Sequence, residues 1–372
     1  MGDEVIKIGI IGAGAVATSV HLPILTRRSD LFQVAAVADF NIESANHLAD
    51  RFGIPAPSRY SSAYDLMNSG KVDAVAVLNS GSHCAVVVAG LNANLHVFCE
   101  KPLAYSRQEM IQIQNALANS SGKLMIGYMK TYDQAVVRAK EAIGESRPRS
   151  VDILVLHPSG DSQLVTSEVS VKAFPASREL IAEFTRGATD LAVEAIGEAA
   201  ATAFGAEYLD IILGSIIHEF SVLRALGIHL THIDYVDRWP TTSRSDSFII
   251  NGRTDDGVRV GIRWFYLDQY PMYQEEVRWV SESAGHHIIF PSPYILHVPT
   301  KLISTKRIGV DHETTTFQSY QPSFEIELTA FHTLVKTGYQ KSDPIADGTE
   351  DLGISQLIAR KICETEKLKF AD

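Results

Sequence analysis

A glycine-rich turn connects an apolar strand to a helix near the start of this chain. The apolar run 5–11 predicts the strand, and the segment GAGAVA at residues 12–17 follows it directly. This segment matches the pattern G-x-G-x-x-G/A, in which Gly12 permits a tight turn and Gly14 lets the backbone approach a pyrophosphate. Ala17 is small enough for close packing of the helix on the strand. The pattern predicts a dinucleotide-binding turn, while an ordinary glycine-rich turn remains the alternative.

The helix that follows the turn adds to this prediction. The first backbone N–H groups of a helix have no acceptor within the helix, and they carry the positive end of its dipole. Ala15 and Val16 supply such groups, so both are predicted to contact the phosphates. Asp39 ends the second predicted strand, where a carboxylate accepts hydrogen bonds from the ribose hydroxyls. The alternative for Asp39 is a turn-forming residue at a strand end.

The residues after Asp39 bear on the choice between NAD and NADP. Phe40 and Asn41 follow it directly, so no Arg or Lys stands there to neutralise a 2′-phosphate. A 2′-phosphate would therefore meet a carboxylate without a counter-cation. The sequence favours NAD as the cofactor, with NADP the less favoured alternative.

The first third of the chain alternates short apolar runs with helical stretches. Continuous apolar strands separated by helices are typical of a parallel sheet that is covered on both faces. The sequence thus predicts an N-terminal doubly wound α/β (Rossmann) domain over residues 1–125, with further strands at 34–38, 72–78, 96–99 and 123–126.

The pattern changes in the remaining residues, 126–372. A strand at 150–155 precedes a long Ala-rich helical region at about 176–226. Alternating segments at 247–252 and 258–264 flank Thr254-Asp255-Asp256-Gly257, which predicts a hairpin, and 276–281 and 287–290 continue the alternation. One-sided alternation predicts an α+β domain with a large, mainly antiparallel open sheet and helices on one face. Trp264, Tyr266 and Trp279 are predicted to lie on its open face and to be buried between subunits of a homodimer or homotetramer.

Composition narrows the class of protein. A chain of 372 residues suggests two domains, and 45% hydrophobic with 21% charged residues is typical of a soluble globular protein. The formal net charge of −11, without a run of Lys and Arg, disfavours nucleic acid and anionic membrane as partners. No uninterrupted apolar stretch of membrane-spanning length and no secretory signal is evident. Cys84 and Cys99 are predicted to be buried in a reducing compartment, so we expect a cytoplasmic protein.

At residues 96–104, HVFCEKPLA, the sequence resembles the glucose-fructose oxidoreductase / inositol dehydrogenase / MocA (Gfo/Idh/MocA) family of oxidoreductases. The resemblance also includes the glycine turn, His21-Leu22-Pro23, the segment GYMKTYD at 127–133, and a helix carrying HEFSVLR at 218–224. It ends with a helix at about 349–364 that is predicted to pack back toward the first domain. It is strong over the first 130 residues and looser after them.

The resemblance implies roles for several residues. Lys101, of the Glu-Lys-Pro motif, would lie beside the nicotinamide and contact the substrate hydroxyl as base or proton relay, and Pro102 is predicted to form a cis bond. Glu100 would orient Lys101 or the cofactor amide. His218 would bind substrate, although a core histidine among apolar neighbours is the alternative. Metal catalysis is not expected, since Val222 stands where a zinc-protease motif has its second histidine.

One position departs from the family pattern. Many members carry an Asp four residues before the histidine, whereas this chain has Gly214. Lys101 would then be the main acid/base group, with help from Tyr128 or Tyr132, or a group from residues 157–213 would replace the Asp. Both tyrosines could equally be packing residues, and nothing in the sequence selects among the further candidates Asp161, Glu168 and Lys172.

The segment Asn79-Ser80-Gly81-Ser82-His83 resembles the family's loop beside the nicotinamide ribose. Asn79, Ser80 and His83 are therefore predicted to bind the cofactor, with an ordinary strand–helix turn as the alternative.

The leading functional prediction is an NAD-dependent dehydrogenase acting on a secondary hydroxyl of a sugar, cyclitol or related polyol. One alternative is an NAD-dependent glycosidase or lyase that uses transient oxidation, a reaction the Gly214 departure favours. The other is a non-catalytic NAD-binding sensor, against which Lys101 argues.

Overall fold

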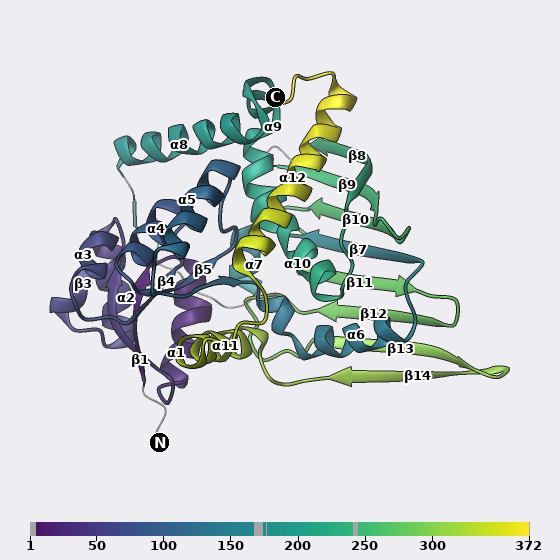
Figure 1. Cartoon of the computed structure of the whole chain (residues 1–372), viewed down its shortest axis with the longest axis horizontal. Coiled ribbons are helices and arrows are strands. Elements are labelled where there is room, and N and C mark those ends of the chain that lie inside the picture. Colours follow the sequence, from purple (N-terminus) through teal and green to yellow (C-terminus); the bar gives the residue numbers. More distant parts are fainter. Residues whose placement is uncertain (1–4, 167–173, 176, 241–244, 372) are drawn as a thin grey trace. The chain divides into compact units, whose positions relative to one another are not determined.

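The computed structural model describes residues 5–166, 174–175, 177–240 and 245–371 of the chain. The chain divides into two compact units (Figure 1). Unit 1 comprises residues 1–128, 171–195 and 327–352, and unit 2 comprises residues 129–170, 196–326 and 353–372. Unit 1 thus contains two later segments in addition to the predicted N-terminal domain of residues 1–125.

Unit 1 is built on a parallel six-stranded sheet in the order β3-β2-β1-β4-β5-β6. A strand order of this kind is doubly wound, and the sequence predicts a doubly wound domain. The central strands are almost wholly buried, because apolar side chains on both of their faces are covered. The strands are β1 (Ile6–Ile11), β2 (Phe32–Ala38), β3 (Arg59–Tyr60), β4 (Ala74–Val77), β5 (His96–Glu100) and β6 (Leu124–Gly127).

Helices follow the strands of unit 1 as the alternating pattern predicts. They are η1 (Ala17–His21), α1 (Leu22–Arg27), α2 (Ile42–Phe52), η2 (Ala56–Ser58), α3 (Ala63–Met67), α4 (Cys84–Asn92) and α5 (Arg107–Ala118). Nearly all of α8 (Arg178–Ile196), most of α11 (Ser323–Thr337) and the first part of α12 (Pro344–Glu366) also belong to this unit. Cys84 and Cys99 are buried free thiols, as predicted.

Unit 2 contains an eight-stranded sheet in the order β14-β13-β12-β11-β7-β10-β9-β8, in which only the β7–β10 pair is parallel. The predicted hairpin is formed by β9 and β10, and Gly257 in its turn has a φ of 88°. The strands are β7 (Ser150–His157), β8 (His232–Pro240), β9 (Asp246–Arg253), β10 (Arg259–Tyr266), β11 (Gln274–Val280), β12 (Ala284–Phe290), β13 (Lys301–Ile308) and β14 (Asp311–Gln318).

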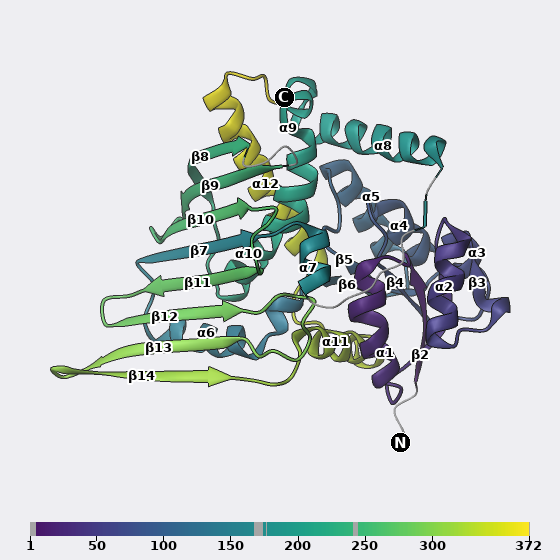
Figure 2. The ribbon, with the colours of Figure 1, turned by 180° about the vertical axis from the view of Figure 1, so that it is seen from behind.

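Helices cover one face of this sheet, and Figure 2 shows the opposite face without a helix over it. The helices of unit 2 are η3 (Met129–Tyr132), α6 (Gln134–Glu145), α7 (Gly160–Thr166), α9 (Glu198–Glu207), η4 (Tyr208–Ile216) and α10 (Ile217–Ala225). The run Glu198–Ala225 is long and apolar enough by composition to span a membrane, with a mean hydropathy of 1.4, but 56% of that window is buried inside the protein. A core helix has the same properties.

The prediction that Trp264 and Trp279 lie on the open face was wrong. Both side chains are buried within the chain, and the indole N–H of Trp264 donates to Ser215 Oγ at 2.9 Å on the helix-covered side. Strand alternation separates two faces but does not say which one the helices cover. The open face instead carries ion pairs such as Arg263–Asp152 and Arg278–Glu276. Homo-oligomerisation stays a prediction.

Candidate functional site

The two glycines of the first turn have different surroundings. Gly12 has a φ of 98°, and a Cβ there would lie 2.6 Å from the backbone nitrogen of Asn79, so only glycine fits. A Cβ on Gly14 would have no heavy atom within 4 Å. The helix begins at Ala15. The turn therefore leaves open space beside Gly14 at a helix start, which fits the phosphates of a dinucleotide.

Asp39 ties the end of β2 to this turn. Its Oδ2 accepts a hydrogen bond from Ala13 N at 2.8 Å, and its Oδ1 accepts one from Asn41 N at 2.9 Å. The second bond is a turn-forming contact, the alternative considered for this residue. Each carboxylate oxygen can accept a further bond, so these contacts are compatible with ribose binding as well.

His83 connects the loop after β4 to the loop after β5. The ring is buried, with Nδ1 2.7 Å from the carbonyl oxygen of Pro102 and Nε2 2.9 Å from the carbonyl oxygen of Asn79. The side-chain amide of Asn79 donates to the carbonyl oxygen of Ser80 at 3.0 Å. The Lys101–Pro102 bond is cis, as predicted. These contacts link the glycine turn, through Asn79, to the Glu-Lys-Pro motif.

Glu100 is held from two sides. His21 Nε2 lies 2.8 Å from its Oε1, and the backbone N–H of Lys101 donates to its Oε2 at 3.3 Å. Burial acts to raise the pKa of Glu100, but the hydrogen bond and charge of His21, together with Lys101, lower it below the ordinary value. Glu100 is thus an anion next to Lys101, consistent with the orienting role predicted for it.

A second buried carboxyl group of unit 1 was missed in the sequence. Glu327, on α11, is fully buried, and neither of its carboxyl oxygens has a hydrogen-bond partner among the described residues. Burial, and then the charge of Glu100, raises its pKa well above the ordinary value and so favours the neutral carboxyl group. A single Glu on an amphipathic helix gives no sequence signal for this.

Helix α8 lies against the loops after β2 and β4. The ring of Phe184 is 5.6 Å from that of Phe40, and a Cβ on Gly81 would lie 3.7 Å from it. Asn41 Nδ2 donates to the carbonyl oxygen of Pro175 at 3.3 Å. The structure thus brings part of the long segment 157–213 to the residues that follow Asp39. The spacing of residues along the sequence could not predict this contact.

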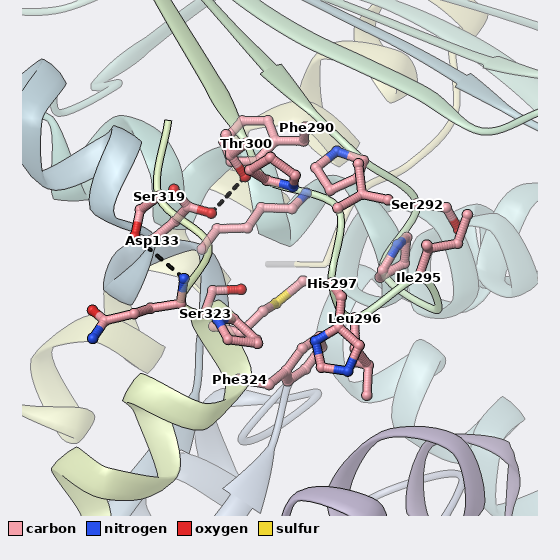
Figure 3. Close-up of a pocket in the computed structure, with 18 of the residues that line it drawn as sticks. Asp133, Phe290, Ser292, Ile295, Leu296, His297, Thr300, Ser319, Ser323 and Phe324 are labelled. Atoms are coloured by element: carbon pink, nitrogen blue, oxygen red, sulfur yellow. Dashed lines mark hydrogen bonds between the residues drawn. The ribbon is translucent and has the colours of Figure 1, made fainter. Parts of the chain in front are cut away.

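Unit 2 contains a pocket at the end of its sheet (Figure 3). Predicted substrate residue His218 lines it, together with Lys130, Asp133, Tyr273 and Glu275. The Thr300 hydroxyl donates to Asp133 Oδ2 at 2.6 Å, and burial raises the pKa of Asp133. The rest of the wall comes mainly from the segments 290–300 and 319–324. A pocket with several hydroxyl, carboxyl and cationic groups suits a polyhydroxylated ligand.

Four of the polar groups around this pocket form one cluster. Lys130 Nζ lies 2.6 and 2.5 Å from the two carboxylate oxygens of Glu275 and 3.6 Å from Glu219 Oε1. The hydroxyl of Tyr273 donates to Glu275 Oε2 at 2.6 Å. Although the sequence showed Lys130 within the family-like segment, it gave no sign of Glu275, which lies 145 residues away.

Tyr128 is buried, and its hydroxyl donates to Asp351 Oδ2. This contact supports the packing alternative left open for Tyr128. Tyr132 is partly buried in η3. Of the other candidates, Glu168 and Lys172 lie outside the described residues, as does the side chain of Asp161.

The surroundings of Gly214 differ from the predicted geometry. A residue four positions before His218 would share its face in an α-helix, but η4 is a π-helix that ends only at Ile216. A π-helix closes i→i+5 hydrogen bonds, so a four-residue spacing does not define a shared face there.

Comparison with known proteins agrees with this fold. Residues 6–128 match the family model described as the oxidoreductase family (Gfo/Idh/MocA), NAD-binding Rossmann fold. An inositol 2-dehydrogenase of Salmonella typhimurium is 36% identical over 141 residues, which cover 37% of this chain and 41% of that relative. This alignment thus spans less than half of either chain. An inositol 2-dehydrogenase of Burkholderia ambifaria is 27% identical over 353 residues, 92% of this chain and 90% of the relative.

Solved structures show the same two-part architecture. A 3-ketoreductase from Actinomadura kijaniata in complex with NADP matches with a TM-score of 0.69 at 16% identity, covering 96% of this chain and 98% of that chain. A putative myo-inositol dehydrogenase from Sinorhizobium meliloti matches with a TM-score of 0.68 at 17% identity, covering 97% and 98%.

Proposed function

Since the chain belongs to the Gfo/Idh/MocA family of NAD(P)-binding oxidoreductases, we propose that it is a dehydrogenase acting on a secondary hydroxyl of a sugar, cyclitol or related polyol. Relatives named inositol 2-dehydrogenase and a neighbour named 3-ketoreductase support this substrate class. Interconversion of a secondary alcohol and a ketone is the reaction that these names share.

The observation that carries the proposal is the chain of contacts around the glycine turn. Gly12 touches Asn79, His83 contacts both Asn79 and Pro102, and Glu100 contacts the backbone of Lys101. All of these residues follow carboxyl ends of parallel strands, where such sheets bind ligands. The backbone of Lys101 is thereby connected to the turn that would hold the pyrophosphate through Gly14, Ala15 and Val16.

In this proposal the bound nicotinamide accepts the hydride, and the protein supplies orientation and proton transfer. Lys101 contacts the reacting hydroxyl as base or proton relay, and Glu100 orients it. His218, on the wall of the unit 2 pocket, binds the substrate. Asn79, Ser80 and His83 form the loop that binds the nicotinamide ribose.

We further propose NAD as the preferred cofactor. The carboxylate of Asp39 already accepts two backbone hydrogen bonds, and Phe40 and Asn41 follow it, so a 2′-phosphate would meet negative charge. Buried thiols at Cys84, Cys99 and Cys363, none of them in a disulfide, support a cytoplasmic location.

The test is absorbance in the NADH band while inositols, aldoses and linear polyols are offered with NAD or NADP. We expect accumulation of reduced cofactor with at least one of these substrates, at higher kcat/KM with NAD. Product formation without net reduced cofactor would instead support the glycosidase or lyase, and binding of cofactor and sugar without turnover would support the sensor.

A further inference from the structure

The unit 2 pocket ends in a buried group of one cation and two carboxyl side chains. Lys130 is 6% exposed, Glu219 is 1% exposed and Glu275 is not exposed. They come from η3, α10 and β11, three elements distant in sequence. Burying two carboxylates beside one ammonium leaves an uncompensated charge, which costs several kcal/mol. The cluster must therefore hold an additional proton at neutral pH.

The geometry indicates where that proton lies. Glu275 accepts hydrogen bonds from Lys130 and from Tyr273, so it is the anion of the pair. Glu219 Oε2 is buried and has no hydrogen-bond partner among the described residues. Burial raises the pKa of Glu219 to about 8, Lys130 acts to lower it, and the charge of the neighbouring Glu275 raises it further. The additional proton therefore lies on Glu219, the carboxyl group with the unsatisfied oxygen.

We propose that Tyr273 and Glu275 form a proton relay for the substrate hydroxyl, with Lys130 as its fixed cation and Glu219 as the group that tunes Glu275 as an acceptor. This relay would take the role of the carboxylate that is absent at Gly214. Tyr273 and Glu275 line the pocket and can meet the substrate, whereas Glu219 is a positioning residue that acts through Glu275. The proposal rests on the proposed dehydrogenase function.

The proton balance of the relay is simple. A bound NAD(P)⁺ would supply the two-electron oxidant for the hydride of the substrate carbon. The proton of the substrate hydroxyl passes to the Tyr273 oxygen as Tyr273 passes its own proton to Glu275. The products are the ketone, reduced cofactor and one proton, which leaves Glu275 for solvent before the next turnover. Burial raises the pKa of Tyr273 well above its ordinary value, so this residue passes a proton on and does not stay ionised.

The other charged groups around the relay are few. Asp133 faces Glu275 from the start of α6, and His218 lines the same pocket from α10. The ring of Phe290 lies 5.3 Å from Lys130 Nζ, within the range of a cation–π contact. These are the groups that surround the relay within the described part of unit 2. The Asp133 carboxyl group accepts a hydrogen bond from the Thr300 hydroxyl.

The charge state of the cluster is tested without any reaction. Infrared difference spectra between the wild-type chain and Glu219→Gln, recorded across pH 6 to 10, report the C=O stretch of a protonated carboxyl group. We expect a wild-type band that disappears near pH 8 and is absent from the variant. The subtraction cancels the contribution of Glu327, which is the same in both proteins. The absence of such a band at pH 7 would overturn the relay.

The relay itself is tested by the pH profile of inositol oxidation. Below pH 8 the proton on Glu219 weakens Glu275 as an acceptor, so log kcat should rise as Glu219 ionises. Glu219→Gln keeps a donor at every pH and should lose this rise.

Tyr273→Phe should lower kcat about 100-fold or more, with a much smaller change in KM. Glu276→Gln, the next residue on β11, contacts Arg278 and His287 on the open face and serves as the unchanged control.

The outcomes separate this inference from the proposed function. A wild-type chain without turnover on any polyol refutes the proposed function, and the relay with it. An active wild type whose profile is unaltered by both Glu219→Gln and Tyr273→Phe refutes the relay alone.

Discussion

The imidazole Nδ1 of His83 lies 2.7 Å from the carbonyl oxygen of Pro102. On the other side of the ring, Nε2 lies 2.9 Å from the carbonyl oxygen of Asn79. Carbonyl oxygens only accept hydrogen bonds, so any hydrogen bond at these positions is donated by a ring N–H. The buried ring holds the loop after β5, which carries Lys101, against the loop after β4.

His83→Ala should loosen this connection. Removing the ring leaves two buried carbonyl groups without their contact, which costs about 1–3 kcal/mol in the free energy of unfolding. Denaturant unfolding measures this loss, and His312→Ala, at an exposed position on β14, is the control. An unchanged unfolding free energy in His83→Ala would show that the ring does not hold the two loops together.

Lys101→Ala should abolish turnover and leave NAD binding nearly intact. A lost proton-transfer group lowers kcat by about 100-fold or more, while the glycine turn and Asp39 still bind the dinucleotide. Steady-state kinetics and fluorescence titration with NAD measure the two effects. Lys123 precedes β6 at the opposite, amino-terminal edge of the sheet, so Lys123→Ala should keep full activity. Turnover retained in Lys101→Ala contradicts the assignment.

The two glycines of the turn should separate stability from binding. Gly12→Ala combines a positive φ with a backbone clash and should destabilise the fold by about 1–3 kcal/mol. The added methyl group of Gly14→Ala has no protein atom within 4 Å, so the free energy of unfolding of this variant should equal that of the wild type to within about 0.5 kcal/mol. Its methyl group enters the space assigned to the pyrophosphate and should weaken ADP-ribose binding roughly tenfold or more. Calorimetric titration checks this, and equal affinities in Gly14→Ala and wild type would exclude the assigned position.

Local patterns predicted the first unit well because its signals are contiguous in sequence. The glycine turn, the apolar strands and the Glu-Lys-Pro motif each lie within a few residues. The strands β1, β2, β4, β5 and β6 form where the apolar runs predict, whereas the short strand β3 was not predicted. The cluster of Lys130, Glu219 and Glu275 could not be predicted, because its members are distant in the chain and meet only through the topology of the second sheet. The π-helical geometry before His218 depends on tertiary packing in the same way, and so does the face of the second sheet on which Trp264 is buried.

Phe184 on α8 should contribute to dinucleotide affinity. Its ring contacts the region of Gly81 and lies beside Phe40, directly after Asp39, where the adenosine half of a dinucleotide would lie. Loss of an aromatic contact worth about 0.5–1.5 kcal/mol predicts a roughly two- to tenfold weaker binding of ADP-ribose to Phe184→Ala. Nicotinamide mononucleotide lacks adenosine, so its affinity should not change. Ile181→Ala, at an exposed position on the same helix, is the control, and equal losses in both variants would contradict a specific role for Phe184.

Glu327 makes the stability of the protein depend on pH in a defined direction. Its folded-state pKa lies well above the ordinary value of 4.5, so between these two values the unfolded chain has lost a proton that the folded chain keeps. This contribution to stability is complete below pH 4.5 and declines as pH rises toward the folded-state pKa, by up to about 1.4 kcal/mol per pH unit.

Glu327→Gln removes the titrating proton and leaves a neutral group of similar size. The free energy of unfolding of the variant, relative to wild type, should therefore rise as the pH increases above 4.5 toward the folded-state pKa. Denaturant unfolding of both proteins at several pH values measures this difference. A difference that is constant over the range would show that the Glu327 carboxyl group is already ionised in the folded protein, paired with a group outside the described residues.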